Sequence, residues 1–135
     1  MTRLRITAAL ATVAVACGIT ACGSSGSDEA RSAVNSYLTA FARGDGQKAC
    51  SLMTAQTRTQ FVTRVKLLAR TTDCTKAVET LRPVMAAALR GAKVTKVKVS
   101  GSEAAATVRA GKRESTTALR KENGTWKVTA GPGTQ

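Results

Sequence analysis

The side chains best suited to covalent chemistry in this 135-residue sequence are its four cysteines, Cys17, Cys22, Cys50 and Cys74. The chain contains no histidine. It therefore lacks the residue that most often acts as a general base at neutral pH and that most often binds zinc. Soft metal ligands are also too few, because no third or fourth partner accompanies Cys50 and Cys74. Thiol chemistry is the chemistry that these residue types favour, and we predict no metal site.

The eight acidic residues are the other candidates for chemistry, and each has a structural explanation as a helix start, a turn residue or an exposed strand position. A catalytic acid needs an apolar pocket and a partner that shift its pKa, and the spacing of these acids indicates neither. The sequence also lacks a P-loop and a G-x-G-x-x-G pattern. We therefore predict no catalytic residues, no cofactor and no enzyme activity. The acids are Asp28, Glu29, Asp45, Asp73, Glu79, Glu103, Glu114 and Glu122.

Residues 1–21 have the pattern of a signal peptide. Arg3 and Arg5 give a basic start, and an uncharged run rich in Ala and Val follows over residues 6–19. A helix of about 14 residues spans roughly 21 Å, which is short of the ~30 Å hydrocarbon core of a membrane. The run therefore predicts a cleaved export signal rather than a permanent span.

The run ends in Ile19-Thr20-Ala21-Cys22, which resembles the lipobox of bacterial lipoproteins. The resemblance implies cleavage before Cys22 and a diacylglyceryl thioether on its sulfur, and two acyl chains give stable anchoring. The alternative site, Ala14-Val15-Ala16-Cys17, has a less fitting residue three positions before its cysteine. We expect a Gly/Ser tether over 22–27 and a protein anchored on the extracytoplasmic face of a bacterial cell membrane.

Cys50 and Cys74 are the thiols that remain after cleavage and lipidation. Free thiols rarely persist in an oxidising, exported setting. Each of the two lies among apolar residues at helical spacing, so both are expected to point inward. We predict a Cys50–Cys74 disulfide that stabilises the fold by roughly 3 kcal/mol in the chain-entropy model. The alternative is two separate buried thiols that act as small hydrophobic residues.

Helical segments are expected to position these cysteines. Apolar residues recur at helical spacing up to Leu89, including Phe61, Val62, Val65 and Leu68 on one side of one helix. The expected segments are a helix from a Ser27 cap to Gly44, a short piece over 47–53, a helix capped by Thr54, a helix capped by Thr72 or Asp73, and a break or new start at Pro83 before a stop at Gly91.

From Lys93 the apolar period changes from helical spacing to two, which predicts four strands in a meander. In the first strand Thr95, Val97 and Val99 are expected to face inward. Asn123-Gly124 is a strong signal for the last hairpin. We expect a flexible tail over 131–135.

Helices followed by antiparallel strands imply an α+β domain with the N-terminal helices packed in one face of a four-stranded antiparallel sheet. The segments SAVNSYLTAFARGDGQKACSLMT, DCTKAV, AKVTKVKVSGSEAAATV and LRKENGTWKV resemble small lipoproteins of the nuclear-transport-factor-two-like superfamily. The resemblance implies a single domain over 28–130, a curved sheet and a cone shape. The superfamily includes ketosteroid isomerases and polyketide cyclases as well as non-catalytic domains, so it does not decide activity.

A strong positive charge is the clearest pointer to a partner, since the net charge is +13. Nine of the 19 Lys and Arg residues after position 21 lie between Lys93 and Lys127, against three acids, for a local balance of +6. We expect one sheet face to contact anionic lipid headgroups or cell-wall polymers; the alternative is a solvated face. Like charges would also disfavour pairing through this face, so we expect a monomer. The face carries Lys96, Lys98, Arg109, Arg120 and Lys127.

A cavity inside the cone would provide a second kind of site, for a small apolar ligand. All four aromatic residues lie on expected core stripes and not between the bases, which argues against nucleic acid as a partner. We predict a non-catalytic ligand-binding or envelope-interaction module; the alternative is a small polyketide-cyclase-like or isomerase-like enzyme. The expected lining residues, for which core packing is the alternative role, are Tyr37, Phe41, Val97, Val108, Leu119 and Trp126.

Overall fold

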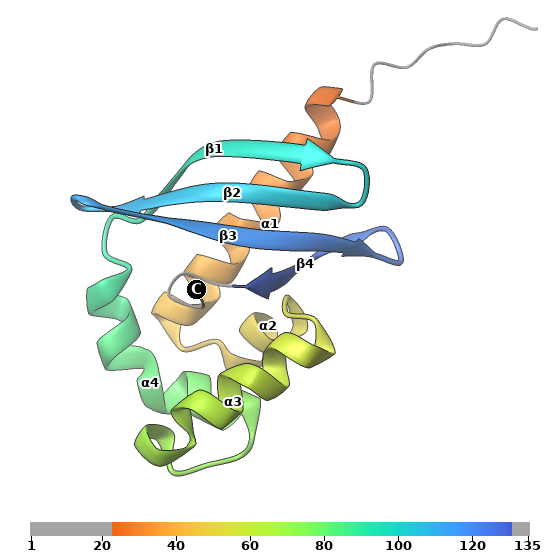
Figure 1. Cartoon of the computed structure of the whole chain (residues 1–135). Helices are drawn as coiled ribbons and strands as arrows, with labels where there is room; N and C mark the ends of the chain where they lie inside the picture. Colours follow the sequence, from red (N-terminus) through yellow and green to blue (C-terminus); the bar gives the residue numbers. More distant parts are fainter. Residues whose placement is uncertain (1–22, 131–135) are drawn as a thin grey trace, which may run out of the picture.

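Helices precede strands throughout the computed structural model, which describes residues 23–130 (Figure 1). The predicted lipidation site Cys22, the predicted signal peptide over 1–21 and the predicted tail over 131–135 lie outside the described residues. The sheet is antiparallel with strand order β1-β2-β3-β4, so the predicted α+β class and the four-stranded meander are confirmed. The elements are α1 (Gly23–Arg43), α2 (Gly46–Ser51), α3 (Ala55–Ala69), α4 (Cys74–Ala88), β1 (Lys93–Ser100), β2 (Glu103–Ala110), β3 (Arg113–Glu122) and β4 (Thr125–Ala130).

The first helix begins earlier than the sequence predicts. α1 starts at Gly23, so the prediction of a Ser27 cap and of a flexible tether over 22–27 is wrong for residues 23–27. The early part of α1 runs beside the sheet, since a Cβ placed on Gly26 would lie 3.8 Å from the Val99 side chain and Glu29 forms an ion pair with Lys121 of β3. The helix therefore gains contact with the sheet over its early turns. Its end is as predicted, since Gly44 has a φ of 73° and follows Arg43 directly.

Side-chain caps start the three shorter helices. Asp45 accepts a hydrogen bond from the backbone N–H of Lys48 at 3.0 Å and caps α2. Thr54 caps α3, and the Asp73 carboxylate caps α4 by accepting from the Lys76 N–H at 2.8 Å, as the sequence predicts. Each cap satisfies a backbone donor that a helix start leaves without a partner.

Two predictions for α3 and α4 are wrong. Phe61 and Val65 pack inward as predicted, but Leu68 is 67% exposed, because the inward side of α3 runs at four-residue spacing through Thr57, Phe61 and Val65 to Ala69. Pro83 does not break the chain into two helices, since α4 continues through it to Ala88. Pro83 is exposed, so water can reach the backbone carbonyl that loses its intrahelical donor.

The sheet departs from simple alternation at one point in its first strand. The pairing of β1 with β2 shifts between Val94 and Lys96. Val94 therefore packs against the core, and Thr95, which was expected to face inward, is exposed. At the opposite edge, Leu52 accepts from the Val128 N–H at 2.7 Å and Thr54 donates to the Val128 carbonyl at 3.0 Å. The segment before α3 thus covers the edge of β4, whereas β1 is left as an edge strand that carries lysines.

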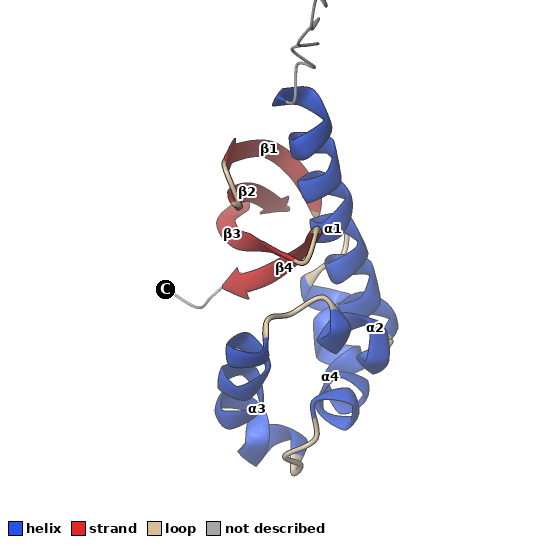
Figure 2. Ribbon diagram, turned by 90° about the vertical axis from the view of Figure 1, so that its right-hand side faces the viewer, coloured by secondary structure: helices blue, strands red, loops and turns tan. Residues whose placement is uncertain are grey.

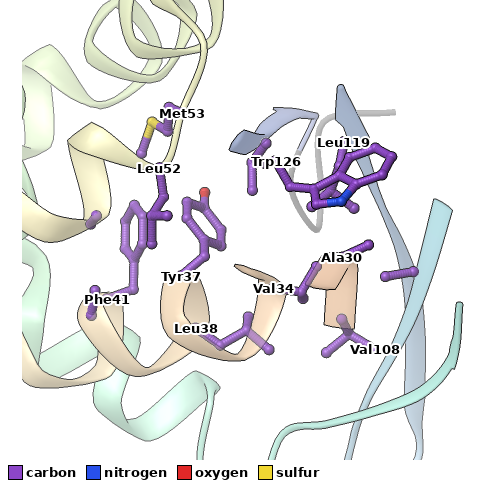
Figure 3. Close-up of a cluster of buried hydrophobic side chains, with 14 of the residues drawn as sticks. Ala30, Val34, Tyr37, Leu38, Phe41, Leu52, Met53, Val108, Leu119 and Trp126 are labelled. Carbon is purple, nitrogen blue, oxygen red and sulfur yellow. The ribbon is translucent and has the colours of Figure 1, made fainter. Parts of the chain in front are cut away.

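One face of the sheet is covered and the other is open. α1 crosses behind the strands in Figure 1 and lies along one side of the sheet in Figure 2, while α2, α3 and α4 lie beyond β4. The core between α1 and the strands is shown in Figure 3. It includes Val34, Leu38 and Phe41 from α1, Met53 from the link to α3, and Leu119 and Val128 from the sheet, all at most 6% exposed.

Candidate functional site

The predicted disulfide is present between α2 and α4. The sulfur atoms of Cys50 and Cys74 are bonded, with a Cα–Cα distance of 6.2 Å and a sequence separation of 24 residues. Cys50 is buried and Cys74 is half-buried against the core, so the bond lies where the sequence placed it, inside the helical layer. The prediction of a Cys50–Cys74 pair is therefore confirmed, and the two cysteines contribute structure and not a free thiol.

The six residues named as a cavity lining are core residues. Five of them, Tyr37, Phe41, Val108, Leu119 and Trp126, are at most 8% exposed, and Val97 packs against the same cluster. Ring contacts continue the packing, since the centroids of Tyr37 and Phe41 are 4.8 Å apart. Burial also raises the pKa of the Tyr37 hydroxyl well above its ordinary value of 10.0. These side chains fill space against one another, as the core alternative expected.

Two of these six also border an open hollow: Leu119 lines a groove on the sheet, and Trp126 lines a hollow beside α1. The hollow, of about 330 Å³, lies between α1 and the β3–β4 hairpin. The indole Nε1 is buried and lies near the Glu29 carboxylate but outside hydrogen-bonding geometry. The hollow is lined by Glu29, Ser32, Ala33, Ser36, Leu52, Gly124, Thr125 and Trp126.

Glu29 and Lys121 form an ion pair beside this hollow. Lys121 Nζ donates to Glu29 Oε2 at 2.9 Å and lies 5.6 Å from the centre of the Trp126 ring. The hydrogen bond and the charge of Lys121 hold the pKa of the exposed Glu29 carboxyl below its ordinary value of 4.5. A general acid at neutral pH needs the opposite shift. Glu29 was predicted only as a helix start, and no local signal in the sequence marks a pair 92 residues apart.

The five predicted bases lie on the open face of the sheet, which also carries acids. Lys96 and Lys98 lie opposite Thr107 and Ala105 in the register of β1 and β2. Neither lysine forms an ion pair within residues 23–130, so their charges face solvent. A shallow groove of about 550 Å³ beside Lys98 runs over the small side chains of Ala105 and Ala118.

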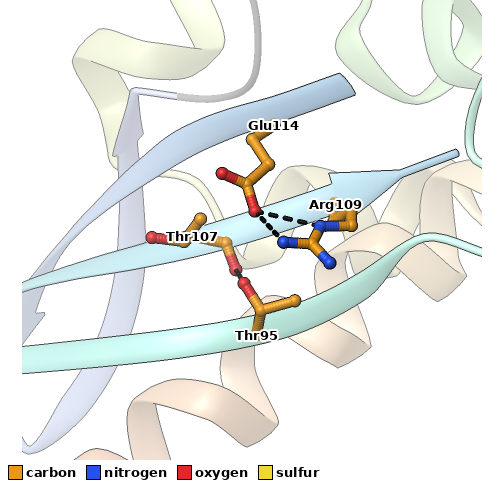
Figure 4. A network of polar contacts seen from close by, with 4 residues as sticks. All are labelled: Thr95, Thr107, Arg109 and Glu114. Atoms are coloured by element: carbon orange, nitrogen blue, oxygen red, sulfur yellow. Dashed lines mark hydrogen bonds and ion pairs between the residues drawn. The ribbon is translucent and has the colours of Figure 1, made fainter. Parts of the chain in front are cut away.

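The other three predicted bases are engaged. Arg109 donates through its Nε to Glu114 Oε1 at 3.0 Å, as Figure 4 shows beside the Thr95–Thr107 contact. Arg120 lies 3.8 Å from Glu103, and Lys127 Nζ donates to the Ser51 carbonyl at the end of α2. Glu114 and Glu103 therefore balance part of the positive charge of this face. The sequence predicts both acids only as exposed strand residues.

Clusters of metal-binding side chains and membrane-spanning helices are both absent from the described residues. Residues 23–130 bring together no three metal-binding side chains of the His, Cys, Asp or Glu type. Within the same residues, no helix combines the length and the apolar character needed to cross a membrane.

The chain matches no protein-family model, no curated protein and no solved structure.

Proposed function

We propose that this protein is a lipid-anchored lipoprotein of the bacterial cell envelope, with a non-catalytic module exposed outside the cytoplasmic membrane. The observation that carries the proposal is the Cys50–Cys74 disulfide in the contact between α2 and α4. Disulfides of this kind persist in exported proteins and are rare in the reducing cytoplasm. The disulfide therefore supports the export that the signal pattern and the lipobox-like Ile19-Thr20-Ala21-Cys22 predict.

The fold we propose is a small nuclear-transport-factor-two-like cone. Two features support it: α1 lies against one face of the antiparallel sheet, and the strand pairing shifts in β1 and again in β4. Such shifts bend a sheet, as a cone requires. The open face is the surface available to a partner, because the covered face is filled by the core.

A binding role suits the described residues better than a catalytic one. Glu29 lines the hollow beside Trp126, and Lys121 keeps it ionised. An ionised, exposed carboxylate in a salt bridge is a poor proton donor at neutral pH. Lys96 and Lys98, in contrast, present unpaired charge on the open face, which favours an anionic envelope component as the partner.

Intact mass spectrometry of the chain extracted from membranes tests this function. We expect the mass of a chain that starts at Cys22 and carries a diacylglyceryl group, with a 2 Da increase after reduction of one disulfide, since each reduced bond gains two hydrogens (~1 Da each). Replacement of Cys22 by Ser should move the protein out of the membrane fraction, whereas Cys17→Ser should leave it there. A full-length, unmodified chain in the cytosolic fraction would refute the proposal.

A further inference from the structure

Positive charge is concentrated at one end of the sheet. Residues 90–96 and 109–114 contain six bases and one acid, for a balance of +5. All six bases are exposed, and the acid, Glu114, is bonded to Arg109. We call these six residues the basic end: Arg90, Lys93, Lys96, Arg109, Lys112 and Arg113.

Strand pairing brings the basic end together from two segments that are distant in sequence. Lys93 lies opposite Arg109 in the β1–β2 register, and Ala110 lies opposite Arg113 in the β2–β3 register. Gly111, with a φ of 62°, forms the turn that carries Lys112. In Figure 1 the link from α4 to β1 and the β2–β3 turn lie at the same left-hand end of the sheet. The sequence prediction of a basic face included only Lys96 and Arg109 of this group.

The other end of the sheet is close to neutral and lies beside the start of α1. A Cβ placed on Gly26 would lie 3.8 Å from Val99, and Glu29 pairs with Lys121, so the early turns of α1 are at this end. Asp28 and Glu29 together with residues 98–103 and 119–125 contain four acids and three bases, for a balance of −1. Val99 and Lys93 are six residues apart in β1, a span of about 20 Å. Charge is therefore polarised along the strands.

We propose that the basic end binds a linear, phosphate-bearing polymer of the cell envelope, and not the headgroups of the membrane that holds the anchor. Three of its six bases are arginines, and two of these, Arg90 and Arg113, form no ion pair within residues 23–130. Planar guanidinium groups bind phosphate oxygens in pairs. In a chain anchored just before α1, the near-neutral end of the sheet is closest to the anionic membrane. The basic end lies about 20 Å further along the sheet. This distance exceeds the Debye length of about 8 Å at physiological salt, so attraction between the basic end and the membrane is screened. This choice of polymer over membrane rests on the proposed lipid anchor; the charge polarity itself does not.

Binding of inorganic polyphosphate to the full chain, purified in detergent, tests the proposal. We expect fluorescence anisotropy of labelled polyphosphate to show binding that weakens as salt is raised. The double variant Lys112→Glu/Arg113→Glu should weaken binding by about tenfold or more, because it reverses two charges at the exposed turn. The single variant Lys93→Glu should also weaken polyphosphate binding. Because Lys93 lies in β1, this loss cannot come from a local change in the β2–β3 turn.

A matched control changes the net charge equally at another place. Arg64 and Lys66 are exposed on α3, away from the basic end, so Arg64→Glu/Lys66→Glu should leave polyphosphate affinity within about twofold of the unaltered chain. Equal losses in the two double variants would overturn the proposal, because binding would then depend only on net charge. Circular dichroism and thermal melting check that each variant is folded.

Vesicles of phosphatidylglycerol and phosphatidylcholine distinguish the polymer from a lipid surface. We expect weak binding of the unlipidated Cys22→Ser chain to these vesicles, unchanged by Lys112→Glu/Arg113→Glu. Vesicle binding that is tighter than polyphosphate binding and is lost in this variant would overturn the choice of a polymer. If the mass spectrum shows no lipid but polyphosphate still binds at the basic end, the proposed anchor is refuted. The assignment of the basic end as a phosphate-binding surface then still holds.

Discussion

The Cα position of Gly46 in α2 faces the backbone of Thr75 in α4 so closely that a Cβ on Gly46 would lie 2.7 Å from the Thr75 Cα. Thr75 directly follows Cys74, and Cys50 lies one helical turn after Gly46. A backbone contact and a covalent bond therefore hold the same pair of helices together. The absence of a side chain at Gly46 is a requirement of this contact, since the neighbouring atoms belong to backbone and cannot rotate away.

Gly46→Ala is expected to destabilise the fold by about 1 to 3 kcal/mol, the usual effect of forcing a methyl group into a packed contact. Gly26→Ala provides the control, because its Cβ would meet Val99 at an ordinary 3.8 Å. Alanine is the better helix former, so Gly26→Ala should be neutral or stabilising. Urea unfolding, monitored by circular dichroism, gives the free energy of unfolding of both variants. Equal stability of the two variants would show that α2 and α4 are not held this closely.

The double variant Cys50→Ser/Cys74→Ser should lower the free energy of unfolding by roughly 3 kcal/mol, because it removes a cross-link that closes a loop of about 25 residues. Unfolding of the unaltered chain in the presence of a reductant should give the same loss. The reductant should have no effect on the double variant. A stability that does not respond to reductant in the unaltered chain would contradict the disulfide.

Local signals in the sequence predict much of the fold. The caps at Thr54 and Asp73 act within three residues, and Asn123 and Gly124 have the φ values of 50° and 78° that their hairpin turn requires. The alternation in β2 is confirmed as well, since Ala104, Ala106 and Val108 are all buried. Each of these features depends on the chemistry of a few neighbouring residues, which a single sequence contains.

The features that sequence reasoning missed depend on distant partners. The inward position of Val94 follows from how β1 pairs with β2, and the early turns of α1 lie beside the sheet, where Glu29 pairs with Lys121. The basic end likewise depends on a strand register that joins Lys93 to Arg109 across the sheet. The composition alone indicates that bases are abundant, but only the pairing shows at which end they gather.

Substitutions at Leu68 and Leu81 test which side chains pack between α3 and α4. Leu68 is 67% exposed and Leu81 is 6% exposed. Leu68→Ala should therefore change the free energy of unfolding by at most about 0.5 kcal/mol. Leu81→Ala should cost about 2 to 5 kcal/mol, since it leaves a cavity between α3 and α4. Chemical denaturation measures both, and a larger loss for Leu68→Ala than for Leu81→Ala would mean that Leu68 packs inward, as the sequence predicted.

The ion pair between Glu29 and Lys121 predicts a specific dependence of stability on pH. Because Lys121 lowers the folded-state pKa of Glu29 below 4.5, the pair stabilises the fold above that pH and loses this contribution as the pH falls through the folded-state pKa. The difference in melting temperature between the unaltered chain and Lys121→Met should therefore be constant near neutral pH and shrink below pH 4.5. Lys127→Met is the control, because Lys127 donates to the Ser51 carbonyl, which does not titrate. The difference in melting temperature between the unaltered chain and Lys127→Met should not change over the same pH range. If the difference shrinks in parallel for both variants, the effect comes from overall charge and not from Glu29.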